Sequence, residues 1–125
     1  MKDAYEVGEM RAAIASTSRA FDDVLEQLPR IVAASRGERI IEGVFYTRAR
    51  LEGNDVGYGS IAAAGAHATI LHWTRNDGAV RDGQLVLLDA GVERESFYTA
   101  DITRTFPVNG TFSPVQRRVY EAVLE

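Results

Sequence analysis

The sequence predicts an α+β domain in which helices and antiparallel strands occupy separate blocks of the chain. Apolar residues recur every three or four positions up to about residue 51, and strand-forming runs with glycine-containing turns follow. The 125 residues are 46% hydrophobic, which is enough for one compact core. Cysteine is absent, so any metal site must use oxygen or imidazole ligands.

Two helical regions are expected before the strands. The first covers residues 4–28, and the apolar run 31–34 continues it beyond a disturbing proline. The Ser-Arg-Gly sequence at 35–37 is the first clear break. The second helix covers residues 38–51, and Gly53 is expected after its end in the left-handed conformation.

Extended segments follow the second helix. Residues 58–65 are small and flanked by glycines, which favours a strand that another backbone or a ligand approaches closely. Residues 67–73 form a second extended run. The segments 85–89 and 101–107 are rich in strand-forming residues, and we expect them to form a hairpin centred on Glu95.

A last helix is expected after Ser113 and Pro114, which supply an N-cap and a first-turn proline. Its apolar pattern reaches Glu125 without a C-cap signal, and Lys2-Asp3 enters the first helix almost at once. Both features lead us to expect that the chain is part of a longer protein.

Asp89 and Asp101 are the principal functional candidates, because each carboxylate interrupts a run of strand-forming residues. In a hairpin centred on Glu95 they lie directly opposite each other, with Cβ atoms about 4.5–5.5 Å apart. Like charges at that distance require a cation. Two metals held about 3.5–4 Å apart could share a bridging water there.

The alternation of strand side chains places Thr103 on the same face as the two aspartates. A structural alternative remains at this point. Asp89 would then belong to a turn with Gly91, and Asp101 would pair with Arg94 or Arg104.

His72 is the third candidate. An imidazole at a strand end could hydrogen-bond a substrate or stabilise a tetrahedral intermediate. The alternative is a partly buried histidine that a backbone carbonyl satisfies. His67 shows no feature that points to chemistry, and Trp73 either walls an apolar pocket or belongs to the core.

The charge distribution excludes two classes of partner. The formal net charge is −4 and both signs are mixed along the chain, so no basic stripe indicates nucleic acid or a membrane surface. The sequence contains no signal-like stretch and no run long enough to span a bilayer. We therefore expect a cytoplasmic protein.

Three segments resemble the Xaa-Pro aminopeptidases (aminopeptidase P), a branch of the pita-bread metallopeptidases. They are the sequences ILHWT at 70–74, LLDAG at 87–91 and DITRTFPVNG at 101–110, and the opening at 2–6 is similar to the helix that begins the family's catalytic domain. The resemblance covers the whole chain. It implies the first half of a pita-bread fold, with long helices packed on an antiparallel sheet.

The resemblance also implies a dinuclear site, usually with manganese, although cobalt or zinc would serve. Asp89 would chelate one metal, Asp101 would bridge both, and His72 would contact the substrate near the scissile bond. A hydroxide bridging the metals would attack the carbonyl between the first residue and proline. The substrate would be a peptide with proline in second position.

The chain departs from the family pattern, because that pattern completes the site with a histidine and two glutamates from a later half. The sequence ends at Glu125, before that half, and it lacks the N-terminal domain that relatives place first. The stretch between the aspartates is also one residue longer than in many relatives.

We expect the chain to be inactive alone and, through its exposed inner face, to form a homo-oligomer. Two alternatives are a prolidase that cleaves dipeptides and a metal-free binding or scaffold module.

Overall fold

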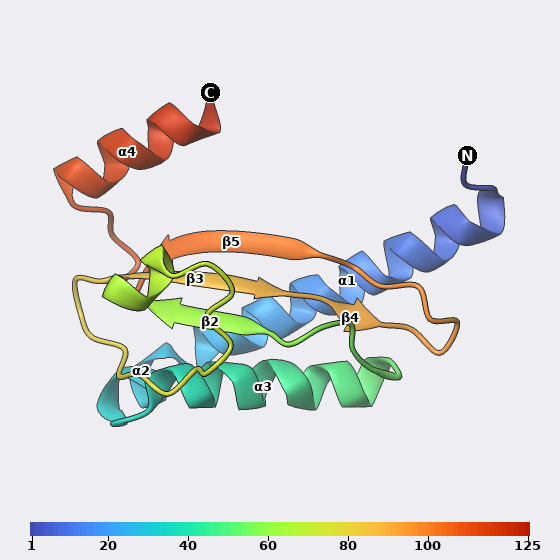
Figure 1. Cartoon of the computed structure of the whole chain (residues 1–125), viewed down its shortest axis with the longest axis horizontal. Coiled ribbons are helices and arrows are strands. Elements are labelled where there is room, and N and C mark those ends of the chain that lie inside the picture. Colours follow the sequence, from blue (N-terminus) through green and yellow to red (C-terminus); the bar gives the residue numbers. More distant parts are fainter.

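The computed structural model describes residues 1–125 and shows long helices packed against an antiparallel sheet (Figure 1). The helices are α1 (Ala4–Glu26), α2 (Leu28–Ala33), α3 (Gly37–Glu52) and α4 (Pro114–Leu124). The strands are β1 (Asp55–Val56), β2 (Ile61–Ala64), β3 (Leu85–Ala90), β4 (Val92–Glu93) and β5 (Ile102–Pro107), with the short 3₁₀-helix η1 (Gly65–Thr69) after β2. The expected α+β arrangement is confirmed.

The helix ends follow from local side-chain chemistry. Asp3 and Glu6 form a reciprocal capping box at the start of α1, with hydrogen bonds of 2.9 and 2.7 Å. Ser113 caps α4 in the same way with Gln116, which confirms the expected N-cap. Pro29 lies in the first turn of α2, where its missing N–H leaves no hydrogen bond unmade.

The main sheet has three antiparallel strands in the order β2-β3-β5, and β1 pairs with β4 beside it. Alternate residues of β3 are buried, and they face the helices. The principal buried apolar side chains of the core include Val24, Ile31, Ile41, Phe45, Val86 and Leu88. Because α1, α2 and α3 cover only that face, the other side chains of β3 point away from the core.

The hairpin between β4 and β5 is centred on Ser96, so the expected centre at Glu95 was wrong by one residue. The Arg94 N–H donates to the Tyr98 carbonyl at 2.9 Å, and the Phe97 N–H donates to the Arg94 carbonyl at 2.8 Å. Phe97 has a φ of 64°, the left-handed conformation that closes a three-residue hairpin loop. A glycine usually takes this position, and here a phenylalanine does.

Two further local predictions were wrong. Gly53 has a φ of −142° and is therefore extended. A glycine is needed at this position for another reason. The Glu93 backbone packs so closely against it that a Cβ would stand 2.3 Å from the Glu93 carbonyl oxygen. Residues 67–73 form no strand, since Gly65 at a φ of 55° turns the chain into η1 and a further turn follows.

The helix α4 stands apart from the other helices (Figure 1). None of the four helices combines the length and the apolar content that crossing a bilayer requires.

Candidate metal centre

Asp89 and Asp101 lie on the same face of the hairpin, the face turned away from the helices. Asp89 pairs with Thr103 in the β3–β5 ladder, and the same register places Asp101 opposite Gly91. The predicted shared face is therefore confirmed, whereas the predicted direct opposition was wrong. The two aspartates are diagonal neighbours, for which a Cα separation of about 7–8 Å is typical.

The Tyr58 hydroxyl lies between the two carboxylates. Its oxygen is 2.6 Å from Oδ1 of Asp89 and 2.8 Å from Oδ1 of Asp101. Burial, together with the hydrogen bonds to both carboxylates, raises the pKa of Tyr58 far above its usual range. A protonated phenol has a single hydrogen to donate, so it can satisfy only one carboxylate at a time.

Sequence reasoning missed Tyr58, although one local signal was available. Gly57 and Gly59 flank it, and a Cβ at Gly57 would stand 1.9 Å from Cγ2 of Thr99. The glycine at 57 thus permits the close backbone approach that brings the tyrosine to the hairpin.

The structural alternative for the two aspartates is contradicted. Asp89 lies within β3 and not in a turn. Arg104 donates to the Thr103 carbonyl at 2.8 Å, and Arg94 donates to the Glu52 carbonyl at 2.6 Å. Neither arginine forms an ion pair with an aspartate of the hairpin, so both carboxylates lack a cationic partner from the protein.

A single hollow of about 320 Å³ brings the three predicted site residues together. Its lining consists of Tyr58, Gly59, Ile61, His72, Thr74, Asp89 and Asp101. His72 is exposed, and it lies in a turn with a φ of 55°, so its expected place at a strand end was wrong. The side chain nevertheless lines the hollow that contains both carboxylates.

A second hollow of about 330 Å³ adjoins the first and shares Ile61, His72 and Asp89 with it. The remaining lining is largely apolar and includes Leu87 and Leu71. A ligand held at the carboxylates would therefore find an apolar surface beside them.

The donor set fits a hard divalent cation. Two carboxylates share one hydroxyl proton and have no arginine or lysine partner, so positive charge between them would relieve their repulsion. Carboxylate oxygens are ligands that magnesium and manganese prefer. Nowhere does the chain gather three or more histidine, aspartate or glutamate side chains that could hold a metal ion. The two carboxylates alone could therefore supply only part of a coordination shell.

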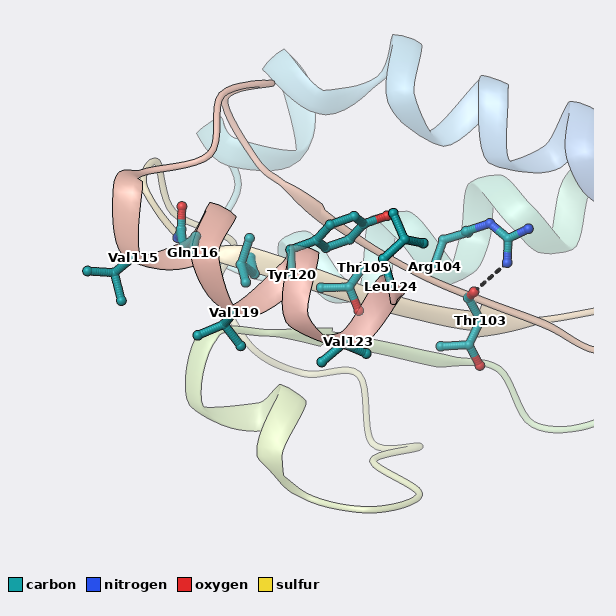
Figure 2. A pocket seen from close by; sticks show the side chains of 10 residues that line it. Thr103, Arg104, Thr105, Val115, Gln116, Val119, Tyr120, Val123 and Leu124 are labelled. Carbon is teal, nitrogen blue, oxygen red and sulfur yellow. Dashed lines mark hydrogen bonds between the residues drawn. The ribbon is translucent and has the colours of Figure 1, made fainter.

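A larger hollow of about 740 Å³ lies between α4 and the strands β3 and β5. Figure 2 shows Val115, Val119 and Val123 in a row along α4. The Tyr120 and Phe112 rings lie in a tilted arrangement with centroids 4.8 Å apart. This hollow contains no carboxylate, so it is separate from the candidate metal centre.

Comparison with known proteins identifies relatives over the whole chain. Residues 8–125 match the model of metallopeptidase family M24. Xaa-Pro aminopeptidase 2 of Streptomyces coelicolor is 64% identical over 100% of this chain and 26% of its own length. Human Xaa-Pro aminopeptidase 3 is 37% identical over 100% of this chain and 24% of its own length. The chain thus spans about a quarter of the length of the curated relatives it matches.

Solved structures show the same fold. A putative aminopeptidase P from Bacillus anthracis superimposes with a TM-score of 0.88 at 36% identity, covering 98% of this chain and 28% of the other. Zinc-substituted Escherichia coli aminopeptidase P in complex with product gives 0.85 at 37% identity, with 98% and 27% covered. The expected pita-bread architecture is confirmed. Because the family model matches residues 8–125, nearly the whole sequence, the chain belongs to metallopeptidase family M24.

Proposed function

We propose that the protein acts as a metal-dependent aminopeptidase that releases the first residue from peptides with proline in second position. The observation that carries this proposal is the hollow that holds Asp89, Asp101 and His72 together. Its support comes from relatives named Xaa-Pro aminopeptidase, one of them 64% identical. The same names favour an aminopeptidase over a prolidase.

Asp89 and Asp101 are the proposed metal ligands, and two manganese ions are the proposed metals. The oxygen donors and the absence of cysteine support manganese over metals that prefer thiolates. Bound divalent metals would polarise a peptide carbonyl and lower the pKa of a water molecule. His72 would donate a hydrogen bond to the peptide beside the carboxylates, and Tyr58 would orient one of the two aspartates.

We further propose that the 125 residues are the first half of a catalytic domain in a longer protein. Two carboxylates alone make an open site, and the curated relatives are about four times as long as the matched segment. The chain alone should therefore be inactive. The remaining ligands would come from residues outside the sequence described here.

The proposed homo-oligomer draws its support from α4. Val115, Val119 and Val123 are 73%, 60% and 83% exposed, so this helix presents an apolar row to solvent. An exposed apolar surface of this kind favours association. A monodisperse monomer in light scattering would contradict the proposal for the chain alone.

The test is manganese-dependent release of the first residue from an Xaa-Pro tripeptide, measured on the 125-residue chain and on the protein extended to the end of its gene. We expect activity in the extended protein only. A folded extended protein that binds peptide without hydrolysing it would contradict the peptidase and favour a metal-free binding module. Hydrolysis by the 125-residue chain would contradict the proposal that these residues are only the first half of the catalytic domain.

A further inference from the structure

Glu38 is a fully buried carboxylate at the start of α3, outside the candidate metal centre. Four N–H groups donate to it. Oε1 accepts from the Ala64 backbone at 2.8 Å and from Nδ1 of His67 at 2.8 Å. Oε2 accepts from the Gly78 backbone at 2.7 Å and from Nε1 of Trp73 at 3.0 Å. Every strong acceptor direction of the carboxylate is thus occupied.

The charge of Glu38 is stabilised by these bonds. Burial alone would raise its pKa, but the hydrogen bonds from Ala64, Trp73, His67 and Gly78 outweigh burial and hold the pKa below its usual value. The group is therefore an ionised acceptor near neutral pH. His67 must present a proton on Nδ1 to meet it.

The four donors enclose the segment 65–78, whose middle contains His72. Ala64 and Gly78 bound this segment, while His67 and Trp73 lie within it. The His67 and Trp73 rings stack with centroids 4.0 Å apart, so the residue after His72 is fixed by both stacking and a hydrogen bond. One carboxylate on α3 therefore contacts this segment near its start, beside His72 and at its end.

His72 depends on that support. Its φ of 55° is a left-handed conformation, which in a residue other than glycine persists only when the surroundings hold it. The His72 side chain makes no hydrogen bond within the chain, so its placement depends on the backbone, which Trp73 anchors one residue later.

A second anchor holds the far end of the segment. Asn76 is fully buried, accepts from the Ala62 N–H at 2.9 Å and donates to the Ser60 carbonyl at 2.9 Å. It also donates to Glu42, one turn after Glu38 on α3, at 3.0 Å. Loss of the hydrogen bonds to Glu38 should therefore loosen the backbone around His72. The end of the segment should stay attached to β2 and α3 through Asn76.

We propose that Glu38 is a positioning residue that holds His72 at the hollow containing Asp89 and Asp101. This inference rests on the proposed function for its catalytic consequence. The anchoring itself is a property of the chain and can be measured without activity.

Glu38→Gln is the informative variant, because an amide cannot replace this carboxylate. Oε2 meets two obligate donors, from Trp73 and Gly78, so the amide oxygen must take that place. The NH₂ group would then face the Ala64 N–H, and the bond to β2 would be lost. Glu52→Gln is the matched control on the same helix, because Glu52 bonds Arg19 and Arg48 and does not touch the segment.

Nuclear magnetic resonance of the 125-residue chain provides the first readout, because Trp73 is the only tryptophan and His72 is one of two histidines. We expect Glu38→Gln to shift both the Trp73 indole N–H signal and the His72 ring signals. Glu52→Gln should leave both in place. An unchanged His72 signal in folded Glu38→Gln would overturn the inference.

Kinetics of the extended peptidase provide the second readout. We expect Glu38→Gln to lower kcat by about 10- to 100-fold with KM little changed, the effect of a misplaced group. A shifted Trp73 signal with wild-type kcat would also overturn the positioning role. If the wild-type protein has no peptidase activity, the proposed function fails, and the His72 signals alone decide the inference.

Trp73→Phe is a milder variant for the case that Glu38→Gln does not fold. It keeps an aromatic ring that can stack on His67, and it replaces the indole, with its donor to Glu38, by a smaller ring without a donor. We expect the His72 signals to shift in the same direction as in Glu38→Gln. Unchanged His72 signals would count against the proposal.

Discussion

Asp89 and Asp101 share one face of the β3–β5 hairpin without being cross-strand partners. The offset between them leaves room for the Tyr58 hydroxyl, which lies 2.6 and 2.8 Å from their Oδ1 atoms. Two carboxylates directly opposed would stand closer together. The hydroxyl thus bridges two carboxylates that would otherwise repel each other.

Tyr58→Phe should weaken manganese binding, because the phenol donates to one of the two proposed ligand carboxylates and orients it. Loss of such an outer contact typically costs 10- to 100-fold in metal affinity, and we expect a change of about that size. Calorimetric titration of the extended protein measures it. Tyr46→Phe on the exposed side of α3 is the control and should bind manganese normally. Equal affinity in both variants would show that Tyr58 has no such role.

Gly91→Ala should disrupt the hairpin that carries the two aspartates. A Cβ at Gly91 would stand 1.6 Å from the Ala100 carbonyl oxygen, so the backbone of β4 or of the facing segment must move. We expect the free energy of unfolding to fall by about 3 kcal/mol or more.

Gly8→Ala is the control for this glycine, because nothing lies within 4 Å of a Cβ there. Gly8 is inside α1, where alanine is favoured over glycine by about 0.5–1 kcal/mol. Urea denaturation should therefore show opposite signs for the two substitutions. A small effect of Gly91→Ala would contradict the close approach of Gly91 to the Ala100 carbonyl.

The ion-pair network between α1 and α3 should make stability depend on acid pH. Hydrogen bonds from Arg19 above all, with a contribution from Arg48, hold the pKa of Glu52 at about 2, below its usual 4.5. A lowered pKa in the folded state means that this stabilisation is complete above pH 4.5 and disappears as the pH falls towards 2.

Glu52→Gln should consequently reduce the free energy of unfolding most at neutral pH. The difference from the wild type should shrink steadily below pH 4.5. Thermal unfolding followed by circular dichroism between pH 7 and pH 3 measures this difference. If the difference in the free energy of unfolding between the wild type and Glu52→Gln stays constant or grows on acidification, Glu52 does not titrate with a depressed pKa.

The face of each strand could be predicted from the sequence, whereas the hairpin register could not. Side chains alternate with a period of two, and a centre at Glu95 differs from the true one by a register shift of two residues. Asp89, Asp101 and Thr103 were therefore still placed on the correct shared face, whereas a one-residue shift would have separated Asp89 from the other two. The register depends on the turn, and its left-handed residue is Phe97. Since no glycine marks that position, the sequence offered no signal for the true centre.

The long-range polar contacts also could not be predicted from sequence patterns. Tyr58 meets residues 31 and 43 positions away, and Glu38 meets Gly78 across 40 positions. Such contacts depend on how β2, β3 and α3 pack, which no local periodicity encodes. The helices were predictable because their caps and apolar spacing are local, as Ser113 illustrates.

The conformation of residues 65–73 also could not be predicted from the local sequence. The sequence pattern at 67–73 indicates an extended run, but Gly65 and the bond between His67 and Glu38 accompany a turn of the backbone into η1. Tertiary contacts thus override strand propensity at the segment that carries His72. The cytoplasmic location stays a prediction.

The most direct test of the account measures bound manganese and Xaa-Pro tripeptide hydrolysis on the same samples of the extended protein. The wild type is compared with Asp101→Asn and with Asp82→Asn, an exposed turn residue on the strand-to-strand connection. We predict that Asp101→Asn loses both bound manganese and hydrolysis, while Asp82→Asn retains both. Hydrolysis that survives in Asp101→Asn, or in wild-type protein stripped of metal by a chelator, would contradict a metal centre at this pair of aspartates.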